Sequence, residues 1–316
     1  MHLIFQPHVT PSAVLYARKL VPNLKPMPYV RIVAFVLLAS FGPAIAGARA
    51  QESLVATEAQ TNPQKLVREV VENGRRLKED PTYWTYRELI RKEGRLETHE
   101  VCQTEAGTID RLVAINNHPL PPEQQRREDA RVQMLLANPA EIRKEKQKQR
   151  EDAAKQYRMF ATFPDAFRYQ YAGTEGRLIR LKFGPNPDFV PDSRQEEVLH
   201  HLAGTIWVDP QQKQLARIDG ELTSEVKFAG GLLGHLDQGG VFSVRFRQVD
   251  SGQWLMAGIR VNMNGKALLF KTISVQEERE FEDYRRVPSN LTLRQAEESL
   301  EKMPSSPKQT AANTSK

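Results

Sequence analysis

Cysteine is almost absent from this sequence, because Cys102 is the only one among its 316 residues. A single thiol cannot form a disulfide within the chain, so the fold must rest on its hydrophobic core. Reactive cysteines need a supporting positive charge that lowers the thiol pKa, and the sequence places none beside Cys102. We therefore expect an inert thiol within a strand.

The signature motifs of common enzyme classes are also missing. The sequence contains no HExxH, GxSxG, GxGxxG, CxxC or P-loop pattern. Acidic residues between 277 and 283 are mixed with arginines, which is typical of a solvated strand face rather than of a catalytic carboxylate pair. These absences do not exclude every enzyme, but they remove the recognisable classes. We expect a non-enzymatic protein without a cofactor.

Acidic residues are absent from positions 1–50, which carry five Lys or Arg residues. The apolar run at 32–41 precedes small residues, and Ala48 and Ala50 form an A-x-A cleavage pattern. As a helix this run would span about 15 Å, half of the ~30 Å hydrocarbon core of a bilayer. The pattern predicts a cleaved signal peptide, and a periplasmic or secreted protein without a stable membrane span.

Removing this leader removes most of the positive charge. The full chain has 45 Lys+Arg and 39 Asp+Glu, so without five leader cations it has 40 against 39, a net charge of +1. A nearly neutral chain has no general attraction for nucleic acid, and we expect no nucleic-acid partner. The start codon is either Met1 or Met27, because Met27 lies just before the apolar run.

A helix and three strands are expected after the leader. Asn62 and Pro63 are a typical N-cap and first helical residue, and the apolar spacing that follows predicts a helix that ends by Pro81. Strand patterns fill residues 83–115, with a tight hairpin turn at Glu93-Gly94.

Residues 121–158 predict two helices of unusual polarity. Asn138, Pro139 and Glu141 form the start signal of the second helix. This helix carries RKEKQKQRE at 143–151, where nothing is apolar. A helix that is polar on every side either projects into solvent or contacts a polar partner. The two helices are therefore a candidate surface for an envelope protein partner.

Short antiparallel strands dominate from residue 167 onward. A capping box at Ser193 and Glu196 predicts a short helix that ends near Ala203. The stretch GTIWVDPQQKQLARIDGEL at 204–222 reads as two strands joined by a polar turn. Whether Trp207 in this stretch faces a ligand cavity or the packed core is left open.

The strongest hairpin signal is Asn264-Gly265. A two-residue turn there would pair Met263 with Lys266 and place Ile259 on the core face, with Trp254 on the opposite, mixed face. After the last strand, the pattern predicts a short helix at 290–302 and then a disordered tail.

Two local patterns could form a site. In EEVLHH, Glu197 and His201 are four residues apart, which on a helix gives a two-ligand metal clamp, although no third ligand is indicated. The alternative is a surface helix that buries its apolar residues. The loop GGLLGHLDQGG at 230–240 is either a mobile apolar lid or a simple connection between strands.

The order of these patterns resembles a known family. An exported chain with YWTYRELI, GTIWVDPQQKQLARIDGEL, GGLLGHLDQGG and GKALLFKTISVQEEREFEDYRRV is similar to periplasmic proteins of the outer-membrane lipoprotein-sorting (LolA-like) group, best over residues 165–287. The resemblance implies a half-barrel with helices plugging its concave side and a cavity that holds acyl chains. The helices at 121–158, with Arg260 and Asn262 in the sheet, depart from that pattern.

We therefore predict an α+β fold, a curved antiparallel β-sheet or half-barrel with helices packed on the concave side and a charged helical insertion. The signal peptide at 1–50 should be followed by one domain at 51–287, with the insertion at 121–158. A short helix and disordered tail should follow at 288–316.

Three functions follow from this prediction. The first is a periplasmic carrier or binding protein for a lipid, a lipoprotein or another apolar ligand. The second is a cell-envelope scaffold that uses the helices at 121–158. The third is a metal-dependent enzyme at Glu197 and His201. The carrier hypothesis expects a cavity lined by large apolar side chains, namely Trp207, Leu232, Leu233, Leu236 and Trp254.

Overall fold

The structure is a computed structural model that describes residues 60, 62–77, 82–193, 195–231, 234–249, 253–267 and 271–302. The predicted signal peptide, the disordered tail, and the cavity candidates Leu232 and Leu233 lie outside the described residues.

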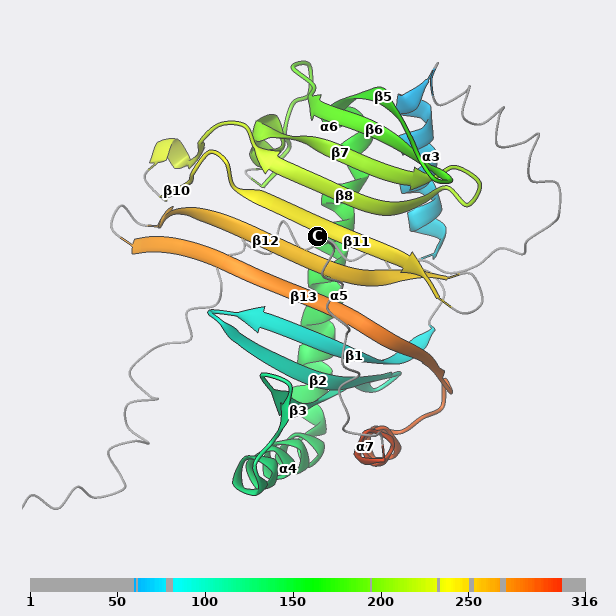
Figure 1. The fold of residues 1–316 in the computed structure, drawn as a ribbon, viewed down its shortest axis with the longest axis vertical. Helices are drawn as coiled ribbons and strands as arrows, with labels where there is room; N and C mark the ends of the chain where they lie inside the picture. The colour runs from blue at the N-terminus through cyan, green and yellow to red at the C-terminus, as the bar shows by residue number, and fades with distance from the viewer. Residues whose placement is uncertain are drawn as a thin grey trace, which may run out of the picture.

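The fold is α+β, as predicted, and is built on one antiparallel sheet of 13 strands that does not close on itself (Figure 1). The main path runs in the order β4-β3-β2-β1-β13-β12-β11-β8-β7-β6-β5, and β9 and β10 lie beside β12. The strands are β1 (Tyr83–Lys92), β2 (Arg95–Thr104), β3 (Gly107–Ile115), β4 (His118–Pro119), β5 (Phe167–Glu175), β6 (Leu178–Pro185), β7 (Leu202–Asp209), β8 (Gln214–Leu222), β9 (Val226–Phe228), β10 (Gly234–Leu236), β11 (Val241–Gln248), β12 (Trp254–Ala267) and β13 (Lys271–Val287).

The helices contact the sheet near its two edges, and α5 crosses behind the sheet in the view of Figure 1. Within the described residues, no helix is long and apolar enough to span a membrane. The α-helices are α3 (Pro63–Leu77), α4 (Pro122–Leu136), α5 (Pro139–Ala161), α6 (Phe163–Ala166) and α7 (Leu293–Glu301), and the 3-10 helices are η2 (Glu196–His201) and η3 (Ala229–Gly231).

Local capping signals start three of these helices, and the two at Asn62 and Asn138 are those that the sequence predicts. The Asn62 side chain accepts a hydrogen bond from the backbone N–H of Lys65 at 2.9 Å, and Asn138 accepts one from Glu141. Thr292 and Gln295 form a complete capping box at the start of α7. Each cap satisfies backbone donors that the first helical turn leaves without partners.

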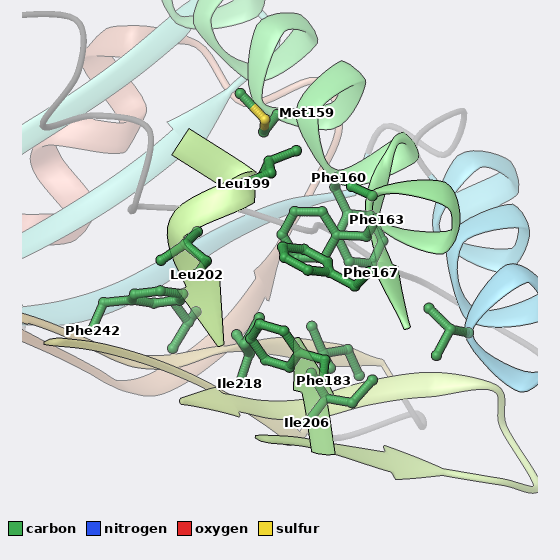
Figure 2. Close-up of a cluster of buried hydrophobic side chains, with 14 of the residues drawn as sticks. Met159, Phe160, Phe163, Phe167, Phe183, Leu199, Leu202, Ile206, Ile218 and Phe242 are labelled. Atoms are coloured by element: carbon green, nitrogen blue, oxygen red, sulfur yellow. The ribbon is translucent and has the colours of Figure 1, made fainter. Parts of the chain in front are cut away.

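The main core lies on one face of β5–β8, β11 and β12, which we call the inner face of the sheet. Figure 2 shows aromatic and aliphatic side chains from α5, α6 and β5 packing over residues of the strands. The ring centroids of Phe160 and Phe163 are 5.3 Å apart, and those of Phe163 and Phe167 are 5.1 Å apart. These interlocked rings fix the end of α5 against the sheet.

A second, smaller core lies on the opposite face of β2 and β3. It joins side chains of five elements, β2, β3, α4, α5 and α7: Cys102, Ile109, Val132, Ile142, Ala296 and Leu300. Burial raises the pKa of the Cys102 thiol to about 11, so the thiol stays protonated and inert at neutral pH.

The hairpin predicted at Asn264-Gly265 is wrong. β12 continues through both residues to Ala267, and Gly265 pairs with Ile273 of β13 rather than turning the chain. The glycine is needed for a different reason. A Cβ atom on Gly265 would overlap the carbonyl oxygen of His235 and lie 3.1 Å from Cα of Leu236, because β10 pairs closely at this point.

The placement of Trp254 opposite Ile259 is also wrong. The β11–β12 register shifts between Arg245 and Phe246, which adds one residue to β12. This β-bulge reverses the alternation, so Trp254 and Ile259 both belong to the main core.

The helix predicted from the Ser193 capping box is a single 3-10 segment, η2, and β7 begins already at Leu202. The backbone N–H of Glu196 does donate to the Ser193 hydroxyl, at 3.3 Å. The predicted cap is therefore confirmed, but the helix is shorter than predicted, because strand pairing begins directly after His201.

We expect Gly204→Ala to destabilise the fold strongly. An added Cβ would overlap the Asp219 carbonyl oxygen and lie 2.9 Å from Cα of Gly220, and backbone in a paired strand cannot move aside. The expected loss in the free energy of unfolding is about 3 kcal/mol, measured by chemical denaturation.

Gly184→Ala is the matched control, because a Cβ on Gly184 in neighbouring β6 would meet nothing within 4 Å. Equal stability changes in the two variants would contradict the packing described here.

Candidate functional site

The predicted cavity residue Trp207 lies on the face of the sheet opposite the main core residues Ile206 and Ile218. Trp207 pairs across the strands with Arg217, whose guanidinium carbon lies 4.5 Å from the indole centroid. The indole N–H donates to Glu175 at 2.7 Å. The ring is therefore buried beneath a cation–π contact.

The predicted cavity residues Trp254 and Leu236 both lie in the main core. The Trp254 indole N–H donates to the Gln212 side chain. Trp207 is buried in the same main core cluster as Trp254, although its pairing with Arg217 places it on the other face of its strand from Ile206.

The predicted metal clamp does not have helical geometry. Glu197 and His201 lie at the two ends of η2, where three residues complete a turn, so side chains four apart do not share one face. The His201 ring is hydrogen-bonded to Ser224 at 2.7 Å. Over the described ranges, no group of three His, Cys, Asp or Glu residues is arranged to hold a metal ion.

The charged helix α5 is anchored only near its two ends. Its buried residues are Ile142 in the second core, and Met159 and Phe160 in the main core. Ile142 and Phe160 are about five turns apart, so they point to the same side of the helix. Gln149 lies on that side between them and is exposed, as are eight of the nine residues at 143–151. The middle of α5 therefore stands clear of the sheet.

The inner face of the sheet changes character between β12 and β13. Residues that pair directly on antiparallel strands share a face. Ile259 of β12 is buried in the main core, and its partner on β13 is Arg279. Arg279 in turn pairs with Ile90 of β1. The face that is apolar as far as β12 thus becomes mixed from β13 onward, with charged side chains between apolar ones.

Apolar side chains at this boundary are only partly buried. Val275 and Phe281 of β13 contact the main core but keep accessible surface. Phe281 also approaches Tyr86 of β1, with ring centroids 6.0 Å apart. This boundary joins an apolar surface to a polar one and is accessible to an additional apolar group.

The charged part of the inner face is internally neutralised. Arg279 donates to Glu88 at 2.9 Å and also to Glu277. Farther along the face, Arg131 of α4 contacts Asp110 at 3.3 Å and Glu128 at 2.7 Å. Pairing of this kind allows charges to lie side by side on a half-buried surface.

His99 lies in the middle of this charged surface, between two carboxylates. Its Nε2 is 3.4 Å from Glu97 and its Nδ1 is 3.4 Å from Asp110. Burial alone lowers the pKa of His99, but the hydrogen bonds and charges of Asp110 and Glu97 raise it by more, so its pKa lies above the ordinary 6.5. Both ring nitrogens face carboxylates, so the site favours a stable imidazolium over a general base.

The opposite face of β1 and β2 holds a separate buried ion pair. Arg87 donates to Glu100 at 2.6 Å, and both side chains are at least nine-tenths buried. Burial raises the pKa of Glu100, while Arg87 opposes the rise. This pair lies beside the second core and not on the inner face, so we assign it a structural role.

The sequence did not indicate that His99, Glu88 and Arg279 are neighbours of one another on the inner face. The alternating charges of β13 indicate an exposed strand face, and only the long-range pairing of β13 with β1 shows that part of this face is enclosed. The one available signal was His99 two residues after Glu97 on the same strand face.

We expect His99→Gln to lower stability in a pH-dependent way. The pKa of His99 is raised in the folded state, so its contribution is fully present below its ordinary pKa of 6.5. The contribution is lost as the pH rises through the folded-state value. The difference in unfolding free energy from wild type should be about 1 kcal/mol at pH 5.5 and shrink as the pH rises above the raised folded-state pKa.

His118→Gln, at an exposed position in β4, is the control. Urea titrations at several pH values would give the comparison. A His99→Gln effect that grows with pH would contradict the charge arrangement described here.

No family model matches this sequence, and no curated protein matches it. A solved structure of a DUF1329 family protein from Desulfovibrio piger is similar at a TM-score of 0.26 and 10% identity, over 73% of this chain and 95% of that chain. A TM-score this low carries no argument about function. The resemblance to the lipoprotein-sorting group therefore stays a prediction.

Proposed function

We propose that this chain is an exported, non-enzymatic periplasmic protein that binds an amphiphilic ligand, such as a lipid or the acylated end of a lipoprotein. The observation that carries the proposal is the change of the inner face from apolar on β12 to a mixture of apolar and charged side chains on β13. A ligand with one apolar and one polar end matches such a surface, because each end then meets groups of its own kind.

The exposed middle of α5, between its two buried ends, supports this proposal. Gln149, on the same side of the helix as the two anchors, is exposed, so the middle of α5 is not packed against the strands. A ligand that lies between the helix and the strands would be held by α5 without first separating a packed helix from the sheet. The partly buried Val275 and Phe281 would contact its apolar end.

The free energy gained by burying apolar groups indicates how long the apolar part of the ligand must be. Each buried CH₂ group contributes about 0.8 kcal/mol, so a short apolar segment gives only weak affinity. A chain of about ten carbons contributes roughly 8 kcal/mol before the costs of association, which is enough for useful binding.

The first test is mass spectrometry of the full chain purified from the periplasm without detergent. We expect a lipid or other amphiphile to co-purify and to be released by organic solvent. A ligand-free protein that also binds no added fatty acid or lysophospholipid would overturn the proposal.

We expect Phe281→Gln to weaken the binding of a fluorescent fatty acid by about tenfold. This aromatic ring is partly accessible at the apolar boundary, and losing its contact with an acyl chain costs about 1.5 kcal/mol. Titration by fluorescence anisotropy would measure the change.

Glu280→Gln is the matched control for that variant. Glu280 neighbours Phe281 on the other face of β13, where it pairs with Arg245. An exposed ion pair contributes little to stability, so this variant should bind as the wild type does. Equal loss of binding in both variants, with melting temperatures unchanged, would place the ligand elsewhere.

A second candidate function is a cell-envelope scaffold that uses α4 and α5. The observation in its favour is the exposure of eight of the nine residues at 143–151. A pull-down from envelope extract should compare wild type with Lys144→Glu/Lys148→Glu. Loss of a specific partner would support the scaffold, and an unchanged set of partners would count against it.

A further inference from the structure

The charges of α5 are segregated around the helix. At about 100° per residue, Arg143, Lys146 and Arg150 fall within an arc of roughly 60°. We call these three residues the basic flank. The carboxylates of the helix all lie on the other side of the axis: Glu141, Glu145, Glu151 and Asp152.

The basic flank forms no ion pair within the described part of the chain, although the Glu105 carboxylate lies near enough to Lys146 for its charge to oppose the lowering of the Lys146 pKa. Arg143 and Arg150 are exposed, and Lys146 donates only to the backbone carbonyl oxygen of Glu105. Burial, together with the nearby charge of Arg150, lowers the pKa of Lys146. The three cations therefore lie close together, and the only carboxylate charge recorded near them in the described residues is that of Glu105 beside Lys146.

The opposite flank of the same helix is different. Lys148 lies 3.4 Å from Glu145, and Lys155 lies 3.7 Å from Asp152. The carboxylates of the inner sheet face also have cationic partners, such as Arg279 for Glu88. Lys144 and Arg158 on that side form no ion pair in the described residues, so the basic flank differs in that its three cations are clustered within one arc with no carboxylate of the helix between them.

The basic flank borders the sheet-facing side of α5. Lys146 follows Ile142 by one turn, and Ile142 is anchored in the second core. The hydrogen bond from Lys146 to Glu105 also holds this part of the helix near the β2–β3 turn. The three cations therefore lie on the flank of α5 next to its sheet-facing side, close to the β2–β3 turn.

We propose that the basic flank binds the anionic head group, a carboxylate or a phosphate, of the amphiphile that lies beneath α5. This inference rests on the proposed function and adds the charge of the ligand to it. The cations extend over about 10 Å of the helix, which suits one head group. Docking onto an anionic bilayer is typical of clusters of four to eight cations.

The test compares two triple charge reversals in the full chain. Arg143→Glu/Lys146→Glu/Arg150→Glu removes the basic flank, and Lys144→Glu/Lys148→Glu/Lys155→Glu changes the net charge equally on the opposite flank. The probes are a dansyl-labelled fatty acid and its uncharged methyl ester, which share the same chain. Circular dichroism confirms folding, and Arg143→Gln/Lys146→Gln/Arg150→Gln replaces the first variant if reversal unfolds α5.

Wild type should bind the acid at least tenfold more tightly than the ester, and 0.5 M salt should reduce this preference. The flank variant should lose the preference while its affinity for the ester is unchanged, and the control should keep it. Equal binding of acid and ester by wild type would overturn the head-group inference but leave the proposed function intact.

Three other results would also overturn the inference. Equal loss of preference in both triple variants would show a general charge effect. A flank variant that changes only sedimentation with phosphatidylglycerol vesicles would assign the flank to a membrane surface. Failure of wild type to bind either probe would overturn the proposed function and this inference together.

Discussion

The antiparallel pairing of β1 with β13 makes one sheet out of two parts of the chain. Residues 83–92 pair with residues 277–287 across nearly the whole sequence. Without this ladder the β1–β4 segment would keep only its helices as links to the main core. Because the ladder fixes where the second core lies, it also fixes the distance that α5 must span between its anchors at Ile142 and Phe160.

Local turn chemistry explains which hairpins could be predicted. Glu93-Gly94 is a turn, and both residues have positive φ angles of 51° and 79°, as a two-residue hairpin requires. Asn264-Gly265 has the stronger turn sequence, yet it lies inside β12. There the glycine serves a close contact with the backbone of β10. The dipeptide shows only that one position has no side chain. Whether a turn or a close contact with a neighbouring strand requires that glycine depends on the tertiary structure.

The candidate site was less predictable than the fold, for a related reason. Alternation along one strand shows which residues share a face, but not which strand lies beside them. His99 and Arg279 belong to one surface only through the pairing of β2 with β1 and of β1 with β13. Trp254 shows the same limit, since one added residue in β12 moved it to the other face.

The charged side chains of this fold are of two kinds, those that are paired with an opposite charge and stabilise the fold, and those that are not paired and are available to a ligand. The carboxylates on the inner face lie within reach of arginines or of His99, so their charges stabilise the half-buried strands and exert little net field outside. The cations at 143, 146 and 150 contribute little comparable to folding, because they form no ion pair within the described residues and only the Glu105 charge lies near Lys146. Mutual repulsion between them costs stability that the helix does not recover internally. This cluster of cations is unfavourable for the chain alone. A bound anion that neutralises the three charges would explain why they lie together.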